Sequence, residues 1–257
     1  MASAPQPTLP LFYNDLMPLN SRDHAKFKAR TMANPNLLNS QHAIPLTADE
    51  FIQAQRHFPI IFSSGDSPLP LALMGLNEGV NTFVDDEGKV TEPVYLPAYI
   101  RRYPFMLARL QQDSEELSLC FDPTAESIGE FPDGTALFDA EGKPAEPVQQ
   151  ALQFCEQFEH AGRRTQQLIE ELGKHELFMD GEVAIQQEGN DKPFLYRGFR
   201  MVDRDKLAAL PDDVVTAWHK NGLLMLIHAH LFSLDQMRII FGRQVMQGKG
   251  PKVEAAA

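Results

Sequence analysis

The sequence has few cysteines and lacks the motifs of the common enzyme classes. Cys120 and Cys155 are its two cysteines, too few for a disulfide framework. Both lie in apolar patterns without a Cys-x-x-Cys pair, which favours buried free thiols in a reducing compartment. The P-loop, the dinucleotide-binding glycine fingerprint, the His-Glu-x-x-His motif and the Gly-x-Ser-x-Gly elbow are missing. These absences remove the common ATPases, Rossmann enzymes, zinc proteases and α/β-hydrolases from consideration.

Positive charge is scarce relative to negative charge. The chain has 23 Lys and Arg against 35 Asp and Glu, a net charge of −12 at pH 7. Such a protein is repelled by phosphates, which argues against a general nucleic-acid or anionic-membrane binder. The N-terminus lacks the positive region and the apolar run of a signal peptide. The most apolar window, residues 222–234, is too short and too polar to span a bilayer. We therefore expect a cytoplasmic protein.

The composition is that of an ordinary globular protein, with 43% hydrophobic and 23% charged residues. Residues 1–10 hold three prolines, and residues 248–257 are rich in Gly, Lys and Ala. Both ends are therefore expected to be disordered. The remaining residues, 11–247, are long enough to bury a core and are expected to form a single domain.

Local patterns predict an α+β fold, with mainly antiparallel strands in the first half and long amphipathic helices in the second half. A capping box of Thr47 and Glu50 predicts a helix that reaches about His57. Apolar runs and alternation predict strands at 59–63, 69–76 and 116–122, and a late hairpin of 180–187 and 193–202 joined by loop 188–192. Apolar spacings of three and four, or short helical patterns, predict helices at 147–172, 204–210, 212–221 and 223–246.

The longest predicted helix, 147–172, carries one continuous apolar stripe. We expect this stripe to pack on the chain's own sheet, with a dimer seam as the alternative. Gly173 fits the position just after the end of this helix. Two turns, at residues 85–89 and 139–143, share the sequence Asp-x-Glu-Gly-Lys. They lack the further ligands of a calcium loop, so they are interpreted as hairpin turns.

No metal or cofactor site is predicted. His228 and His230 form a His-x-His pair, but on the predicted helix their side chains point about 200° apart. They are therefore interpreted as two histidines flanking an apolar helix face rather than as ligands of one ion. No pair of acidic residues has the context of a general acid and base, so no catalytic residue is assigned.

The strongest candidate for recognition is the segment of residues 95–107, which holds three tyrosines, two prolines and two adjacent arginines. Its candidate ligand-binding or partner-binding residues are Tyr95, Tyr99, Arg101, Arg102, Tyr103 and Phe105. We expect the segment to be extended on a sheet, so that one arginine faces inward and the other outward. The buried arginine requires an acceptor. Two acceptors are considered: an internal carboxylate (Asp85, Asp86 or Asp122) or an anionic group of a ligand or partner chain.

Several runs resemble the SapC-like family of proteobacterial proteins. They are Pro-Leu-Thr-Ala-Asp-Glu-Phe at 45–51, Pro-Ile-Ile-Phe at 59–62, Leu-Ala-Leu-Met-Gly-Leu at 71–76, Asn-Thr-Phe-Val-Asp-Asp-Glu-Gly at 81–88, Tyr-Leu-Pro-Ala-Tyr-Ile-Arg-Arg-Tyr-Pro-Phe at 95–105, Leu-Phe-Asp-Ala-Glu-Gly-Lys at 137–143, Gly-Phe-Arg-Met-Val-Asp at 198–203 and Ser-Leu at 233–234. The resemblance runs from about Ile44 to Phe241, and its most specific block is Ile-Arg-Arg-Tyr-Pro-Phe. The family often places Trp after the first Gly turn, where this chain has Lys89 and Val90. An aromatic binding residue is therefore not carried over to that point.

The resemblance implies an accessory role rather than a reaction. Relatives are often encoded near flavin-dependent halogenase-like proteins and outer-membrane receptors, which implies an uptake or modification system. We therefore expect a non-catalytic binding protein with a protein partner or a small anionic ligand, without a nucleic-acid partner, membrane-spanning segment or cofactor, and with a homodimer left open. The family name implies a surface-layer structural protein as one alternative. An enzyme whose active site no motif reveals is the other.

Overall fold

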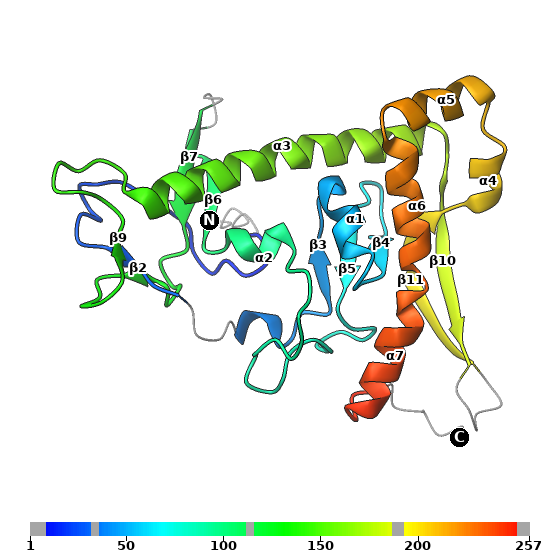
Figure 1. Ribbon diagram of the computed structural model, residues 1–257, viewed down its shortest axis with the longest axis horizontal. Helices are drawn as coiled ribbons and strands as arrows, with labels where there is room; N and C mark the ends of the chain where they lie inside the picture. The colour runs from blue at the N-terminus through cyan, green and yellow to red at the C-terminus, as the bar shows by residue number, and fades with distance from the viewer. Residues whose placement is uncertain (1–8, 32–35, 112–115, 187–192, 251–257) are drawn as a thin grey trace, which may run out of the picture. The chain divides into compact units, whose positions relative to one another are not determined.

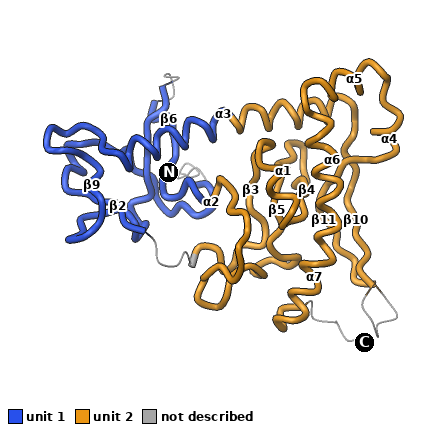
Figure 2. Tube along the Cα trace, in the orientation of Figure 1, with its two compact units in different colours: residues 1–33, 101–160 blue, residues 34–100, 161–257 orange. Residues whose placement is uncertain are grey.

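The computed structural model describes residues 9–31, 36–111, 116–186 and 193–250 (Figure 1). The chain divides into two compact units: residues 1–33 with 101–160, and residues 34–100 with 161–257 (Figure 2). We call them unit 1 and unit 2. A compact unit is defined by its internal contacts, so the expectation of a single domain over residues 11–247 stays a prediction. Most of the two ends expected to be disordered, residues 1–8 and 251–257, lie outside the described residues.

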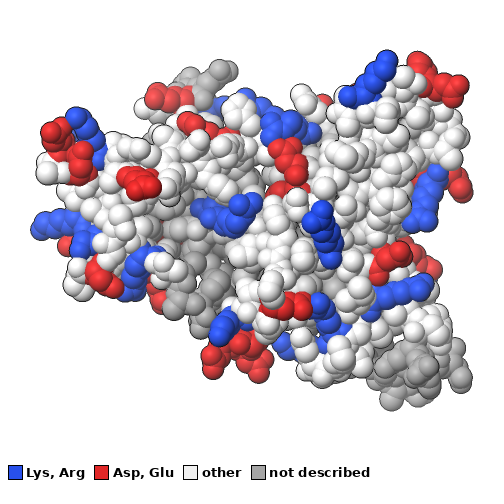
Figure 3. All heavy atoms as spheres, in the orientation of Figure 1, with Lys and Arg blue, Asp and Glu red and all other residues white. Residues whose placement is uncertain are grey.

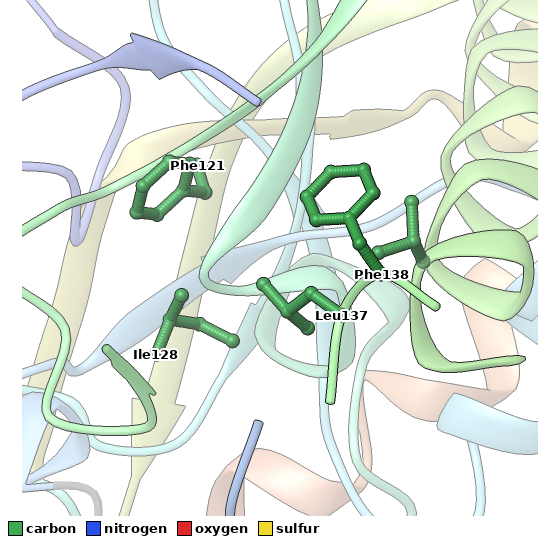
Figure 4. Packing of buried hydrophobic residues seen from close by; sticks show 5 residues of the cluster. Phe121, Ile128, Leu137 and Phe138 are labelled. Atoms are coloured by element: carbon green, nitrogen blue, oxygen red, sulfur yellow. The ribbon is translucent and has the colours of Figure 1, made fainter. Parts of the chain in front are cut away.

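In the described part of unit 1, short strands form two antiparallel sheets. One has the order β1 (Met17–Pro18), β7 (Leu117–Phe121), β6 (Phe105–Arg109), and the other β8 (Ile128–Gly129), β2 (Lys28–Ala29), β9 (Thr135–Ala136). Strand β7 confirms the strand predicted at 116–122. In the core cluster of unit 1, Phe121, Ile128, Leu137 and Phe138 gather around one point together with Val148 (Figure 4).

Unit 2 contains a five-stranded antiparallel sheet. Its order is β10 (Phe178–Ile185), β11 (Phe194–Val202), β4 (Ile60–Phe62), β5 (Pro70–Leu73), β3 (Ala43–Pro45). Strands β4 and β5 confirm the two predicted buried strands, and β10 with β11 confirms the late hairpin. The predicted loop at 188–192 lies outside the described residues. The α+β class is therefore confirmed.

Helices account for much of the rest of the chain. They are η1 (Asn36–Leu38), η2 (Ala48–Glu50), α1 (Phe51–Ala54), α2 (Ala98–Arg102), α3 (Glu146–Lys174), α4 (Arg204–Ala208), α5 (Asp212–Lys220), α6 (Leu223–Ser233) and α7 (Gln236–Met246), where η denotes a 3₁₀ helix. The predicted capping box at Thr47 is present, and the helix that it begins is η2 followed by the short α1. The predicted helices at 204–210 and 212–221 are α4 and α5.

The second half of the apolar stripe of α3 is buried, at Ala161, Thr165, Leu168 and Leu172. The expectation that the stripe packs on the chain's own sheet stays a prediction. Thr165 also contributes a polar contact, because its Oγ1 accepts a hydrogen bond from the amide of Ala48 at 2.8 Å. This contact fixes the start of η2 in unit 2.

The predicted end of α3 at Gly173 is wrong, because the helix passes through this glycine and ends at Lys174. The left-handed residue that closes the helix is Glu176, at φ 52°. The amide of Leu177 donates to the carbonyl of Leu172, and the amide of Glu176 donates to the carbonyl of Gly173. This is the hydrogen-bond pattern of a Schellman motif.

The single helix predicted at 223–246 is also wrong, since α6 and α7 are separate helices. The reason lies at Ser233, whose hydroxyl donates to the carbonyl of His230 at 2.6 Å and accepts from the amide of Ile60 at 2.8 Å. A serine that bonds back to its own helix competes with the backbone ladder and bends the helix.

Residues Leu223–Met246 are also long and apolar enough, by length and composition, to count as a membrane-span candidate. Half of their most apolar window is buried inside the protein, and a core helix of a soluble protein passes the same test. This is weak evidence for a membrane span. The expectation that no segment crosses a membrane therefore stays a prediction.

The two Asp-x-Glu-Gly-Lys segments are hairpin turns, as predicted. Gly88 and Gly142 have φ values of 79° and 78°. In the first turn, Asp85 Oδ1 accepts hydrogen bonds from the amides of Glu87 and Lys89 at 3.0 and 2.9 Å. Asp139 repeats this arrangement in the second turn. The aspartates therefore hold the turn backbone.

Candidate recognition segment

The first half of the candidate segment is held by a buried carboxylate of unit 2. Glu50 is 5% exposed, and its Oε2 accepts from the amide and hydroxyl of Thr47 at 2.8 and 2.9 Å. Its Oε1 accepts from the hydroxyl of Tyr95 at 3.0 Å and from the amide of Ala98 at 2.6 Å. One carboxylate thus connects the capping box of η2 to the start of α2. Tyr99, the second candidate tyrosine, is 7% exposed.

The second half of the segment is held by a buried carboxylate of unit 1. Asp122 is fully buried, and its Oδ1 accepts from the amide and hydroxyl of Thr124 at 2.8 and 2.7 Å. Its Oδ2 accepts from the amide of Asn14 at 2.9 Å and from the hydroxyl of Tyr103 at 3.3 Å. Burial, reinforced by this carboxylate, raises the pKa of Tyr103 to about 12. The phenol therefore stays protonated and acts as a donor at neutral pH.

The two arginines differ in exposure. Arg102 is 7% exposed, and its Cζ lies 4.3 Å from the ring centre of Phe158 and 5.8 Å from that of Tyr13. Arg101 is exposed, and its Cζ lies 5.2 Å from the ring centre of Phe154. Both geometries are cation–π contacts. One arginine therefore faces inward and the other outward.

The expected cause of this difference, an extended backbone, is wrong. The segment is not extended at the arginines, because residues Ala98–Arg102 form α2. Successive side chains on a helix diverge by about 100°, which separates Arg101 from Arg102. Pro97 precedes the helix, a position where proline favours a helix start. The strand begins only at Phe105, which is half-buried and whose carbonyl accepts from the hydroxyl of Tyr13 at 2.7 Å.

Asp85, Asp86 and Asp122, the three carboxylates considered as possible acceptors for the buried arginine, each contact other groups in the structure. Asp122 binds Tyr103 and the backbone, and Asp85 holds its own turn. The carbonyl of Asp86 accepts from the side-chain amide of Asn39 at 3.4 Å, and its carboxylate lies 4.0 Å from Lys249. Among the six candidate residues, Arg101 is the exposed one.

A buried histidine completes the central sheet of unit 2. His230 is fully buried, with Nδ1 2.8 Å from the carbonyl oxygen of Ile60 and Nε2 3.1 Å from the amide nitrogen of Val202. Because the amide of Val202 can only donate, Nε2 is the acceptor and Nδ1 carries the proton. Strands β4 and β11 pair at Phe62 and Arg200. Two residues further along the antiparallel strands, Ile60 would face Val202. The imidazole of His230 lies between them and binds the carbonyl of Ile60 and the amide of Val202 in place of a direct hydrogen bond between the strands.

Burial lowers the pKa of His230 to about 4, so the ring is neutral at pH 7. His228 is exposed and stacks on Phe232, with ring centres 5.9 Å apart. The two histidines thus have different surroundings. In the ranges that the structure describes, no group of three or more His, Cys, Asp or Glu side chains is placed to hold a metal. The expectation of a metal-free protein stays a prediction.

The family model for SapC matches residues 19–240. The chain belongs to the SapC family. The matched range of this SapC chain includes the candidate segment and three buried groups, Asp122 within unit 1 and Glu50 and His230 within unit 2. No curated protein and no solved structure matches the chain.

The two cysteines of this SapC chain are free and buried. Burial raises the pKa of Cys155 to about 11, although the positive charge of Arg102 acts in the opposite direction. Burial also raises the pKa of the Cys120 thiol. Both thiols are therefore protonated at neutral pH and poor nucleophiles. The predicted buried thiols are confirmed, and the reducing compartment stays a prediction.

Sequence reasoning missed what Glu50 and His230 do in the SapC chain. The capping box identified Glu50 as a local helix-start residue, but its bonds to Tyr95 and Ala98 cross 45 and 48 sequence positions. The contact between His230 and Ile60 crosses 170 positions. Contacts this distant leave no local pattern. The sequence did offer one chemical clue to the role of His230. A histidine within an otherwise apolar stretch needs a polar partner if it is buried.

Proposed function

We propose that this SapC-family chain is a non-catalytic accessory protein that binds a protein partner or a small anionic ligand at the segment of residues 99–105. Arg101 makes the central contact. The observation that carries the proposal is the outward direction of this arginine on a segment whose neighbours are anchored inward. A guanidinium held in this way presents a planar fork of donors suited to a carboxylate or phosphate.

The anchoring supports a binding role because it holds the part of the segment that carries Arg101. Within unit 1, Tyr103 is bound to the buried Asp122. The ring of Phe154 supports Arg101 from one side. A preorganised side chain loses less conformational entropy on binding than a freely rotating one. The segment therefore suits recognition without a large rearrangement.

The buried titratable groups support a non-catalytic role. Glu50 and Asp122 each accept four hydrogen bonds from nearby donors. His230 uses both ring nitrogens on backbone groups. Groups engaged in this way hold the fold instead of exchanging protons with a substrate. We place the protein in the cytoplasm, as an accessory component of an uptake or modification system.

The experiment compares two exposed arginines of unit 1. A tagged chain is used to capture partners from cytoplasmic extract of the native host, alongside the variants Arg101→Ala and Arg109→Ala. Both side chains are exposed, so both variants are expected to melt within about 1 kcal/mol of the parent. We expect Arg101→Ala to lose the partner that the parent and Arg109→Ala retain. Equal capture by all three proteins would overturn the proposed binding site.

Cell fractionation tests the location separately. Recovery of the native protein in the cytoplasmic fraction is the expected result. Recovery in the cell-surface fraction would replace this proposal with the surface-layer structural role.

A further inference from the structure

The outer face of α6 and α7 carries a row of exposed apolar side chains. They are Met225, Phe232, Ile239 and Met246, with exposed fractions of 58%, 68%, 51% and 82%. Successive members are seven residues apart. The inner face is apolar as well, since Ile227, Leu231, Met237, Ile240 and Phe241 are buried. α6 is apolar on nearly all sides, and such a helix is normally covered on all sides, so the outer row is expected to have a partner.

The row is continuous across the junction between the two helices. Leu234 and Asp235 keep right-handed helical backbone angles, with φ and ψ of −62° and −25° and of −64° and −23°. In Figure 1, α7 follows α6 with a bend. A seven-residue repeat drifts by only about 20° per repeat on an α-helix. The four side chains therefore lie along one side of the helix pair. The face of the molecule shown in Figure 3 has few charged side chains in the region where α6 lies in Figure 1.

A groove runs beside the first half of this row. It has a volume of about 670 Å³ and is lined by Ile52, Leu224, Met225, His228 and Phe232 among others. The groove is mostly apolar, although Gln55, Lys220 and Asn221 also line it, and it leaves space beside Met225 and Phe232 that side chains of another chain can fill.

We propose that this face binds the same face of a second copy, with the two α6–α7 pairs antiparallel. The two-fold axis passes between Asp235 and Gln236, the midpoint of the row. This axis places Phe232 of one copy against Ile239 of the other, and Met225 against Met246. A two-fold contact is self-complementary, so each apolar pair occurs twice.

Charge supports this arrangement. Asp235 and Arg238 are both exposed at the midpoint, and neither makes an ion pair within the described residues. The two-fold axis brings Asp235 of each copy to within one helical turn of Arg238 of the other, which gives two opposite-charge pairs. An anionic membrane as the occupant is disfavoured, because the net charge of the chain is −12.

The extent of the row sets the expected strength. The row covers 22 residues, from Met225 to Met246, and spans about 33 Å of helix. A contact made by one such helix pair from each copy is expected to bury an area at the small end of specific protein interfaces. The dimer is therefore expected to dissociate in the micromolar range. This inference does not depend on the proposed role of Arg101, which lies in unit 1.

Sedimentation equilibrium of the full chain tests the proposal. The parent is expected to shift from the chain mass of 28.9 kDa toward twice that mass as concentration rises through the micromolar range. Phe232→Asp is expected to remain monomeric. Leu69→Asp is the matched control, since Leu69 is 54% exposed and lies outside the row, and it is expected to dimerise like the parent. A parent that stays monomeric at about 100 μM would overturn the proposal.

Two further measurements test the orientation. Asp235→Arg places like charges together across the axis and should weaken the dimer at least tenfold, and the added change Arg238→Asp should restore it. Asp235→Cys, in a chain whose natural cysteines are buried, should give a disulfide-linked dimer on oxidation, whereas Leu69→Cys should not. Failure of both would overturn the antiparallel arrangement. Flotation of the parent with neutral vesicles, lost in Phe232→Asp without any dimer, would assign the face to a lipid surface and overturn the second-copy proposal.

Discussion

At the residue scale, two buried carboxylates each gather donors from separate parts of the chain. Burying a charge is costly unless it is fully hydrogen-bonded. Glu50 and Asp122 meet this condition with four donors each. Each carboxylate thus stabilises its own unit through four hydrogen bonds, and losing any one of the four donors would leave part of a buried charge without a partner. Removing the charge or one partner is therefore expected to have a large effect.

Replacing Glu50 with glutamine tests this expectation. The amide group of Glu50→Gln turns a donor toward at least one of the four existing donors, so we expect a loss of about 2–4 kcal/mol in the free energy of unfolding. The neighbour Asp49 is the control, because its ion pair with Arg164 is at the surface. Asp49→Asn should cost less than about 1 kcal/mol. Urea denaturation measures both values, and equal losses would contradict the role given to Glu50.

The two adjacent arginines give a second prediction. Arg102→Ala removes a buried guanidinium from between the rings of Phe158 and Tyr13, and we expect a loss of about 2–4 kcal/mol. Arg101→Ala removes an exposed side chain and should cost less than about 1 kcal/mol. Thermal denaturation of both variants is the measurement. Melting of Arg102→Ala at the temperature of the parent would show that the buried arginine does not hold α2.

At the scale of secondary-structure elements, close packing fixes the hairpin of β10 and β11. Gly181 lies at an irregularity in the register between the two strands. A Cβ at this position would lie 2.1 Å from Cε2 of the Phe199 ring, so there is no room for a side chain. The ring of Phe199 covers the glycine, and only the absence of a Cβ allows this contact.

Gly181→Ala is therefore expected to destabilise the protein by at least about 2 kcal/mol, since the buried Phe199 ring must move. Gly162 lies on α3, and a Cβ added there would meet no atom within 4 Å. Gly162→Ala should instead be neutral or stabilise by up to about 1 kcal/mol, because alanine favours a helix more than glycine does. Chemical denaturation of the two variants gives the comparison. A stabilising Gly181→Ala would mean that the hairpin adapts freely.

The elements that the sequence predicted correctly are those with local causes. The turns at Gly88 and Gly142 follow from an aspartate that binds the next few amides, and the start of η2 follows from Thr47 and Glu50. One error has a cause that is partly long-range. Ser233, where α6 ends, bonds both to His230 of its own helix and to the amide of Ile60, and no Gly or Pro marks this end. In α2, the dense aromatic residues suggested a strand, although Pro97 was a signal for a helix.

The candidate site was predictable only in part. The concentration of Tyr and Arg in residues 95–105 identified the segment, but the pattern could not say which side chains point inward. That depends on Glu50, Asp122 and Phe158, each distant in sequence from the residue that it contacts. The seven-residue spacing of the row on α6 and α7 can be read from the sequence. The sequence alone does not show that these four side chains are exposed rather than buried, so it could not identify the row as a surface.

At the scale of the whole molecule, His230 makes stability depend on pH. Its pKa is about 4 in the folded protein and near 6.5 in an unfolded chain. The unfolded state therefore binds more protons between these values, so the contribution is complete above pH 6.5 and is lost as the pH falls toward 4. The loss amounts to about 3 kcal/mol. Protonation of Nε2 would also set a donor against the amide of Val202.

Urea denaturation between pH 7 and pH 4.5 measures this effect. His230→Gln keeps one donor and one acceptor but does not titrate, so it should be less stable than the parent at pH 7 and should lose less stability on acidification. His228→Gln is the matched control at an exposed position, and it should follow the parent. A parallel pH profile for the parent and His230→Gln would rule out His230 as the source of the dependence.

The division of the chain between the two units also sets an order for synthesis on the ribosome. Unit 1 has its last residue at 160, whereas unit 2 begins at residue 34 and is completed by residues 161–257. Strand β4 is made early, but its neighbour β11 comes only at Phe194–Val202, and the partner of the Ile60 carbonyl is His230. After β3, β4 and β5 have been synthesised, more than 100 further residues must follow before β11 is complete. During that time the edge of β4 that pairs with β11 has no neighbouring strand. Such an interval is when a nascent chain depends on chaperones.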